Sequence, residues 1–223
     1  MKIRCSQLGR LMGGFERPKA PLSEEAKSYI EELFIEQEYG RKPIIGSKEM
    51  IKGTRVEEQS ISLLSEVTNT LYLKSRKEYQ NDILVGHIDV MDDTYVIDVK
   101  SPYNLWTYTH ADLSSVYAWQ LMGYMWLTGR NLAKLAYCLV DAPEDMIMDE
   151  FRRACFARNV DNLADGAELK EIEEQVRKNM TYGDIPKEKR VKLFEVAYSE
   201  EKIQLIKDKY QLALDYYNLL KNT

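Results

Sequence analysis

Short apolar runs separated by polar pairs alternate with helix-like patterns along this chain. The two clearest runs, residues 84–91 and 95–100, are rich in Val, Ile and Tyr, and two aspartates and a threonine lie between them. β-branched and aromatic residues favour strands, whereas Asp and Thr favour turns. Residues 84–102 therefore predict a tight β-hairpin.

One face of this hairpin gathers charged side chains. Closing the hairpin symmetrically about its two aspartates places Asp89 opposite Val96 and His87 opposite Asp98. The period of two along a strand then keeps Lys100 on the face of Asp98. The opposite face is apolar and consists of Tyr95, Ile97 and Val99. Two carboxylates and an ammonium on one face are costly unless they neutralise one another or hold a metal, so we expect a cation site here.

The remaining pattern indicates an α/β fold. A helical period predicts helices at residues 6–12, 23–37, 47–67, 111–128, 144–157, 169–178 and 200–222. Further strands are expected at residues 71–74, 133–140 and 191–198, with a linker at 18–21 and loops at 40–46 and 103–110. The helix at 111–128 and the strand after it complete a strand–helix–strand unit behind the hairpin.

Polar residues interrupt the apolar faces of two predicted helices. Glu57 shares its face with Ile61 and Leu64, whereas Glu58 lies on a solvated face. A carboxylate on an apolar face is a functional candidate, although a partner lysine within the fold would account for it equally well. Gln120 lies in the apolar stripe of the later helix, and a buried glutamine is usually a structural hydrogen-bond partner.

The first predicted helix begins at Ser6, next to Arg4. Free backbone N–H groups and a hydroxyl at a helix start form a potential anion site. The simpler interpretation is that Ser6 only caps the helix.

Composition and charge indicate an ordinary globular protein. The chain has 223 residues, of which 44% are hydrophobic and 30% charged, so it can bury a sizeable core. A net charge of -5 argues mildly against a non-specific nucleic-acid coat but does not exclude a local basic groove. Basic clusters, each of them more commonly plain solvated surface, occur at Lys74, Arg76 and Lys77, at Arg152, Arg153 and Arg158, and at Lys187, Lys189, Arg190 and Lys192.

Cysteine usage and hydropathy bear on location. The three cysteines, Cys5, Cys138 and Cys155, are too few and too scattered for a disulfide framework or a metal knuckle. The N-terminus lacks a signal-peptide pattern, and the most apolar window, residues 116–127, is too short to cross a bilayer. We therefore expect a soluble cytoplasmic protein, in the host cytoplasm if the source is a virus, with no membrane association.

Taken in order, these residues resemble the PD-(D/E)XK nuclease superfamily. Residues 86–89, Gly-His-Ile-Asp, resemble its Gly-x-x-Asp strand, and residues 98–100, Asp-Val-Lys, resemble its (Asp/Glu)-x-Lys strand. An Asp-x-Lys tripeptide recurs by chance in most proteins, but the ordered set with Glu57 and Gln120 is far more specific. Ile88 stands where the name-giving proline would be, which is common in that superfamily.

Within the superfamily the sequence is most similar to lambda-exonuclease or YqaJ-type viral recombination nucleases, with the RecB-type domain next. Residues 53–57, Gly-Thr-Arg-Val-Glu, resemble their Gly-x-x-x-Glu helix, and residues 117–120, followed by Tyr124, resemble their Gln helix. Ser6 resembles the serine that holds a terminal 5′ phosphate. The arginine ahead of that serine in lambda exonuclease has no match, and Arg4 is the candidate substitute.

The resemblance implies a restriction-endonuclease-like core, in which helices flank a central mixed β-sheet, at residues 1–142. A mostly helical extension, residues 143–223, would pack on this core. The scattered cysteines argue against the iron–sulfur variants of the RecB group.

The resemblance also implies a metal site. Mg²⁺, for which Mn²⁺ would substitute, is expected on Asp89, Asp98 and the Val99 carbonyl, with Glu57 on a water of its shell or on a second ion. Lys100 would orient or help to deprotonate the attacking water.

Three further residue roles follow from the same resemblance. Gln120 would position Lys100 or a phosphate oxygen. Ser6 and Arg4 are candidates for DNA phosphate contact, as is Tyr124, for which packing with an incidental hydrogen bond is the plainer role.

The expected function is a metal-dependent DNA exonuclease of phage-type recombination or repair, acting 5′ to 3′ on duplex DNA. An endonuclease on the same fold, structure-specific or restriction-type, is one alternative. A catalytically silent module that binds DNA or protein is another, and in a plain α/β protein Asp98 and Lys100 would merely pair across a surface. By resemblance, the partners would be DNA, two further copies in a ring trimer, and a single-strand annealing protein.

Overall fold

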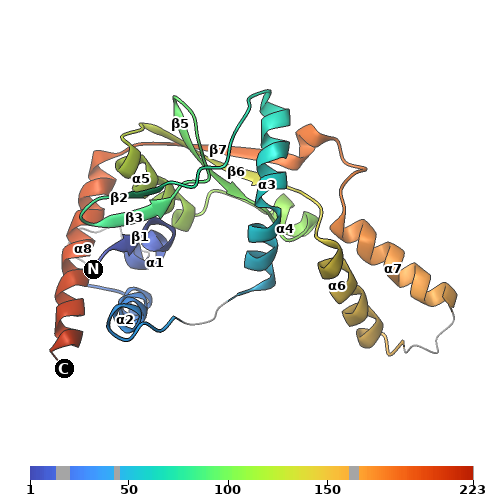
Figure 1. Ribbon diagram of the computed structural model, residues 1–223, viewed down its shortest axis with the longest axis horizontal. Coiled ribbons are helices and arrows are strands. Elements are labelled where there is room, and N and C mark those ends of the chain that lie inside the picture. The colour runs from blue at the N-terminus through green and yellow to red at the C-terminus, as the bar shows by residue number, and fades with distance from the viewer. Residues whose placement is uncertain (14–20, 43–45, 161–165, 223) are drawn as a thin grey trace.

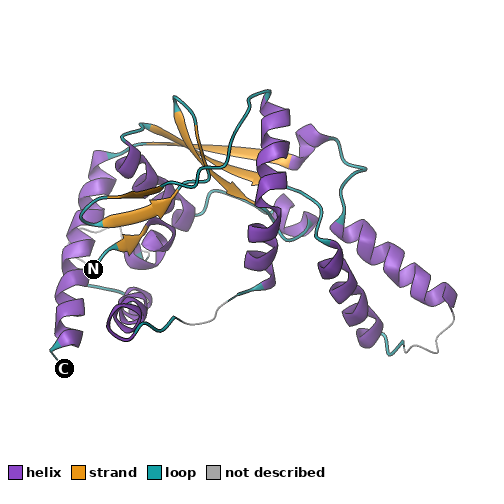
Figure 2. Ribbon diagram, viewed as in Figure 1, coloured by secondary structure: helices purple, strands orange, loops and turns teal. Residues whose placement is uncertain are grey.

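The computed structural model describes residues 1–13, 21–42, 46–160 and 166–222. It has an α/β fold in which helices flank two mixed sheets (Figures 1 and 2). This confirms the predicted fold class, although the strands divide between two sheets where one central sheet is predicted. The predicted linker at 18–21 lies, except for Pro21, outside the described residues.

The strands pair in two groups. One sheet has the order β1-β3-β2 and consists of β1 (Ile3–Arg4), β2 (Glu78–Gln80) and β3 (Leu84–His87). The other has the order β4-β5-β6-β7 and consists of β4 (Val90–Met91), β5 (Tyr95–Lys100), β6 (Leu132–Cys138) and β7 (Val191–Ala197). β1 runs parallel to β3 and β5 runs parallel to β6, and the other pairs are antiparallel.

Eight α-helices and two 3-10 turns are described. The helices are α1 (Leu8–Met12), α2 (Glu24–Tyr39), α3 (Lys48–Thr68), α4 (Leu105–Thr109), α5 (Ser115–Thr128), α6 (Glu144–Ala157), α7 (Gly166–Met180) and α8 (Glu200–Lys221). The turns are η1 (Cys5–Gln7) and η2 (Lys187–Arg190). The helices expected at 23–37, 47–67, 144–157, 169–178 and 200–222 and the strands expected at 133–140 and 191–198 are thereby confirmed, with ends shifted by a few residues.

Helices cover both faces of the four-stranded sheet (Figure 1). On one face, Ile61 and Leu64 of α3 pack with Ile97 and Val99 of β5. On the other face, Val96 of β5 belongs to the main core, which α5 forms together with residues of α1, α2 and α8. Because side chains alternate along a strand, Asp98 and Lys100 point to the face of α5. The predicted division of this strand into an apolar face and a charged face is confirmed.

The chain after residue 142 contributes two different parts. Helices α6 and α7 pack on each other through a small apolar cluster of their own and extend away from the sheets (Figure 1). Strand β7 and helix α8 return to the core, where β7 pairs antiparallel with β6. The predicted boundary at residue 142 stays a prediction.

The predicted hairpin differs in its extent and register. Only β4 pairs with β5, and β3 belongs to the other sheet. Met91 lies opposite Val96, which shifts the register by two residues from the prediction. The cause is the side chain of Asp92. Its Oδ1 accepts hydrogen bonds from the backbone N–H of Thr94 at 2.7 Å and of Tyr95 at 2.6 Å. These bonds move the turn toward Thr94. Because a shift of two preserves the faces, the predicted grouping of charges survives.

Three other local predictions are wrong. Residues 71–74 form a loop and not a strand, with Leu71 82% exposed and Leu73 75% exposed, because no neighbouring strand pairs with them. The predicted loop at 103–110 contains α4, which a capping box between Asn104 and Thr107 begins. The helix predicted from residue 111 begins only at α5, where Ser114 is the N-cap.

Replacement of Asp92 by alanine tests the turn. The loss of its two backbone hydrogen bonds should lower the free energy of unfolding by about 1–2 kcal/mol, as measured by urea denaturation. The neighbouring Asp93→Ala serves as the matched control, since Asp93 is exposed and its removal should change stability by less than about 0.5 kcal/mol. Equal losses in both variants would contradict this account of the register.

Candidate active site

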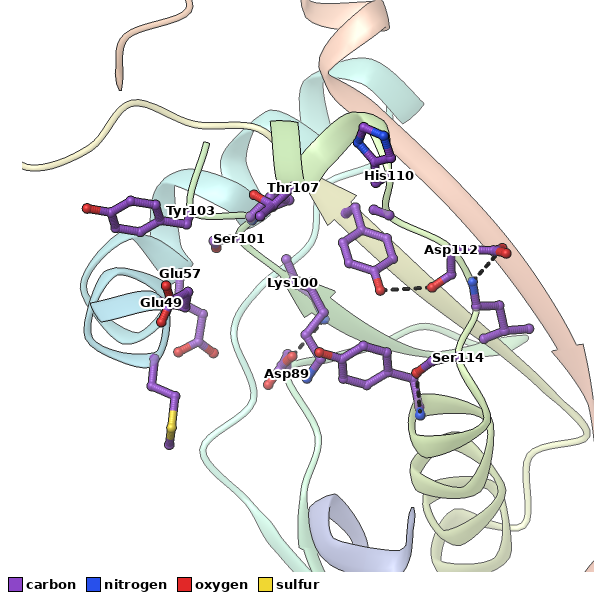
Figure 3. Close-up of a pocket in the computed structure, with 18 of the residues that line it drawn as sticks. Glu49, Glu57, Asp89, Lys100, Ser101, Tyr103, Thr107, His110, Asp112 and Ser114 are labelled. Carbon is purple, nitrogen blue, oxygen red and sulfur yellow. Dashed lines mark hydrogen bonds between the residues drawn. The ribbon is translucent and has the colours of Figure 1, made fainter. Parts of the chain in front are cut away.

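A cleft of about 810 Å³ lies between α3 and the segment that follows β5 (Figure 3). Glu57 enters it from α3, and Asp89 and Lys100 lie at its floor. Asp89 occupies the break between β3 and β4, and Lys100 is the last residue of β5. The departure of the chain from one sheet to the other therefore places Asp89 beside the charged end of β5.

Two carboxylates lie close together here, Asp89 at the floor of the cleft and Asp98 buried beside it. Asp89 Oδ2 accepts a hydrogen bond from the backbone N–H of Val99 at 2.7 Å. Asp98 is only 1% exposed, and its Oδ1 accepts a hydrogen bond from Gln120 Nε2 at 2.7 Å. Its Oδ2 is buried without a partner in hydrogen-bond geometry, although Lys100 Nζ lies 2.7 Å away as an ion-pair partner. One buried oxygen is thus left incompletely satisfied.

The electrostatics of the cleft follow from burial and from like charge. Burial raises the pKa of Asp89 to about 7, and the negative charge of Asp98 adds to this effect. Burial alone would lower the pKa of Lys100, but the neighbouring charges of Asp98 and Asp89 outweigh it, so the pKa lies above its ordinary value. Lys100 therefore remains a cation at neutral pH, and its ammonium lies 5.0 Å from the centre of the Tyr117 ring.

Gln120 and Tyr124 form a short chain of hydrogen bonds behind the carboxylates. Gln120 is 4% exposed, and its amide donates to Asp98 and, at 2.9 Å, to the hydroxyl of Tyr124. In this structure Gln120 thus contacts Asp98, whereas the resemblance predicts that it positions Lys100 or a phosphate oxygen. A Cβ on Gly86 would lie 2.8 Å from the Tyr124 ring, so the first glycine of the Gly-x-x-Asp motif makes room for this tyrosine.

The sequence leaves two interpretations of Glu57 open, a functional carboxylate or the partner of a lysine within the fold, and the structure has features of both. It lines the cleft with Asp89, and its carboxylate also accepts a hydrogen bond from Lys74 Nζ at 2.7 Å. Lys74 belongs to the loop before β2. The neighbouring Glu58 is exposed, as predicted.

The residues at the floor fit a hard divalent cation. Within residues 1–13, 21–42, 46–160 and 166–222, no three His, Cys, Asp or Glu side chains gather into a complete metal site. Mg²⁺, however, commonly takes one or two carboxylates and keeps several waters. Asp89 and Asp98 supply two, and Val99, whose carbonyl is the predicted third ligand, lines the same cleft. A cation here would relieve the unsatisfied Asp98 oxygen and the repulsion between the two carboxylates.

The predicted phosphate contacts are not gathered in this cleft. Ser6 lies in η1 and is exposed, and it does not cap α1, because the chain makes a 3-10 turn before that helix begins. The guanidinium of Arg4 donates to Glu36 of α2. Neither residue lines the cleft, and Tyr124 is buried beneath it.

Two contacts at the site escape sequence reasoning. Tyr117 shares the helix face of Gln120, so its helical spacing is a signal, but its contact with the Lys100 ammonium is not visible in sequence. Lys74 stands in a basic cluster, and nothing in its neighbourhood indicates that it pairs with Glu57.

Among the described helices, none is long and apolar enough to cross a membrane.

The raised pKa of Asp89 predicts the pH dependence of stability without divalent cations. Because the pKa of Asp89 is higher in the folded state than in the unfolded chain, protonation of Asp89 stabilises the fold. This stabilisation is complete below about pH 4 and is lost as the pH rises to about 7. The Asp89→Asn variant should lack this loss, which amounts to at most roughly 4 kcal/mol. Urea denaturation in EDTA from pH 4 to pH 8 measures the difference between the variant and the wild type. Parallel pH profiles would contradict the assignment.

Comparison with solved structures finds proteins that share this fold over nearly the whole chain. No protein-family model and no curated protein matches the sequence. A phage-related exonuclease from Haemophilus somnus 129PT is similar over 100% of this chain and 96% of its own, with a TM-score of 0.74 and 22% sequence identity.

An alkaline exonuclease from Laribacter hongkongensis is similar over 98% of this chain and 88% of its own, with a TM-score of 0.66 and 14% identity. Its complex with dAMP is equally similar. Both likenesses include the chain after residue 142, for which the sequence alone offers no match. The protein therefore has the fold of these two exonucleases, and this shared fold agrees with the resemblance that the sequence predicts.

Proposed function

We propose that this protein is a divalent-metal-dependent nuclease that hydrolyses DNA phosphodiester bonds and acts as an exonuclease. The observation that carries the proposal is the convergence of four side chains at one site on the fold of two exonucleases. Asp89 and Lys100 line the cleft, and the buried Asp98 contacts both Lys100 and Gln120. The sequence pattern alone predicts a functional role for each of these residues.

The proposed cofactor is Mg²⁺, with Mn²⁺ able to replace it. Asp89, Asp98 and the Val99 carbonyl would hold it, and Glu57 would hold a water of its shell or a second ion once it has released Lys74. When bound, the cation would lower the pKa of a water molecule and neutralise charge on the scissile phosphate.

The side chains of the cleft then have separable roles. Lys100, fixed by Asp98 and by the Tyr117 ring, orients the attacking water and stabilises charge on the phosphate. Without a bound cation, the charges of Asp98 and Asp89 raise the pKa of Lys100 and favour its cationic form. Gln120 fixes the rotamer of Asp98. Attack in line with the leaving oxygen would leave a 5′ phosphate and a 3′ hydroxyl.

The exonuclease mode rests on the two structural neighbours. Both are described as exonucleases, and the Laribacter protein has been solved with dAMP, a nucleotide of the kind that an exonuclease releases. Action on duplex DNA from 5′ to 3′, a role in phage-type recombination or repair, a ring trimer and an annealing protein as partner belong to the same proposal, as does a cytoplasmic location. Ser6 and Arg4 remain the proposed phosphate contacts, and they would act outside the described cleft.

An endonuclease on the same fold is the second candidate, because the residues that line the described cleft do not by themselves require a DNA end. A silent binding module is less well supported, since the carboxylates, the lysine and the glutamine are all present.

Alanine at Asp98 or Lys100 tests the catalytic assignment. Either change should reduce Mg²⁺-dependent DNA cleavage by at least about 100-fold, because Asp98 would hold the cation and Lys100 would stabilise charge on the reacting phosphate. Thermal unfolding followed by circular dichroism checks that both variants fold. Asp93→Ala and Lys134→Ala, whose residues lie outside the cleft, are matched controls that should retain activity. Undiminished cleavage in either test variant would overturn the site.

The mode of cleavage is tested with one plasmid in two forms. Linear duplex should be degraded to mononucleotides in Mg²⁺ and spared in EDTA, and the closed circle should survive in both, because an exonuclease needs an end. Gel electrophoresis and chromatography of the products provide the measurement. Nicking of the circle would favour the endonuclease.

A further inference from the structure

Helix α3 carries a fully buried lysine that the proposed chemistry does not use. Lys52 is 0% exposed. Its ammonium donates three hydrogen bonds to backbone carbonyls, at 3.0 Å to Pro102, at 3.0 Å to Tyr103 and at 2.9 Å to Val140. Since an ammonium has three donors, these bonds satisfy it completely. The same side chain thereby joins α3 to the segments that follow two adjacent parallel strands, β5 and β6.

A lysine is a costly way to fill this position. Burial lowers the pKa of Lys52 to about 8, which reports the loss of hydration of its charge, and Asp141 only partly compensates. The Tyr182 ring, 5.6 Å from the ammonium, adds a cation–π contact. An apolar side chain of similar length would fill the same space without this penalty. The directed bonds of Lys52 are therefore the property that an apolar residue could not supply.

A second buried polar contact joins the same two segments. Ser60 of α3 is 0% exposed, and its hydroxyl lies 2.7 Å from the hydroxyl of Ser101. Lys52 and Ser60 thus bond to consecutive residues, 101–103, which directly follow Lys100. Along α3 they lie on either side of Glu57. We call Lys52, Ser60 and their bonds to this segment the α3 clamp.

The spacing on the helix explains what the clamp controls. Lys52, Val56 and Ser60 recur every four residues and form the stripe that faces the sheet. Met50, Gly53, Thr54 and Glu57 form the adjacent stripe, which lines the cleft. Rotation or sliding of α3 on the sheet would move Glu57 relative to Asp89 and Lys100. Bonds at two separated points of the stripe resist both motions, whereas apolar contacts are not directional.

We infer that Lys52 and Ser60 are positioning residues, which hold Glu57 at the cleft by fixing α3 to the segment after Lys100. The inference rests on the proposed function, because it gives Glu57 its role there. A displacement of about 1 Å at a reacting centre can cost about 10²-fold in rate, so the clamp acts through geometry without touching the substrate.

A double-mutant cycle separates positioning from general stabilisation. Lys52→Met should lower kcat about 10-fold or more and raise the Mg²⁺ concentration for half-maximal cleavage. When Glu57 is already replaced by glutamine, adding Lys52→Met should change both quantities less than about 2-fold, because the group that the clamp positions is gone. The same factor in both backgrounds would overturn the inference. The Tm shift produced by Mn²⁺ without DNA should show the same non-additivity.

Lys209→Met is the matched control. Lys209 is the other fully buried lysine of the described residues, 2% exposed, but it lies on α8 and donates to the Pro21 carbonyl at 3.2 Å, far in the fold from Glu57. Its replacement should lower the Tm while leaving kcat within about 2-fold. A loss of kcat equal to that of Lys52→Met would show that destabilisation alone accounts for both.

Ser60→Ala covers the case in which Lys52→Met does not fold. This smaller change should lower kcat, and combining it with Ser101→Ala should add nothing, because both remove the same bond. Additive losses would contradict the clamp.

Crystal structures of Ser60→Ala and, if it folds, Lys52→Met keep the inference separate from the proposed function. They should show α3 displaced along β5 and the Glu57 carboxylate withdrawn from Asp89. A native position of Glu57 would overturn the clamp even if the wild type proves to have no nuclease activity.

Discussion

The structure of the cleft depends on one buried carboxylate. Asp98 lies on the central strand β5 with almost no solvent contact, and a charge in that position is tolerated only if the protein pairs it. The fold supplies Gln120 from α5 on one oxygen and Lys100 from the same strand beside the other. The pairing is incomplete, because Asp98 Oδ2 has no partner in hydrogen-bond geometry. Burial and the nearby charge of Asp98 raise the pKa of the second carboxylate, Asp89. Two adjacent carboxylates with one unsatisfied oxygen, on Asp98, favour the binding of a divalent cation.

The architecture around Asp98 brings each neighbour from a different element. The break between β3 and β4 lets Asp89 approach the end of β5, and the alternation of β5 separates the charged face from the apolar face under α3. Helix α3 lies over the apolar face yet contributes Glu57 to the cleft at the edge of that face. The position of Glu57 in the cleft therefore depends on how α3 is oriented on the sheet. Lys52 and Ser60 fix that orientation through directed bonds at the exit of β5.

Local signals in the sequence predicted much of this arrangement, and the failures have physical causes. The period of two on β5 and the helical period around Glu57 and Gln120 placed those side chains on the correct faces. The register of the hairpin was wrong because the Asp92 side chain selects a later turn. Residues 71–74 have strand-like composition but no strand beside them, which only the tertiary structure decides. Long-range contacts, such as Gln120 with Asp98 and Lys52 with three carbonyls, leave no periodic trace in the sequence.

Asp89 and Asp98 are proposed to form a divalent-cation site. Anomalous diffraction from crystals soaked in Mn²⁺ tests it most directly, since the peak locates the metal without reference to activity. We expect a peak between the two carboxylates, within coordination distance of both and of the Val99 carbonyl. The absence of a peak at saturating Mn²⁺, with the ion pair of Asp98 and Lys100 unchanged, would contradict it.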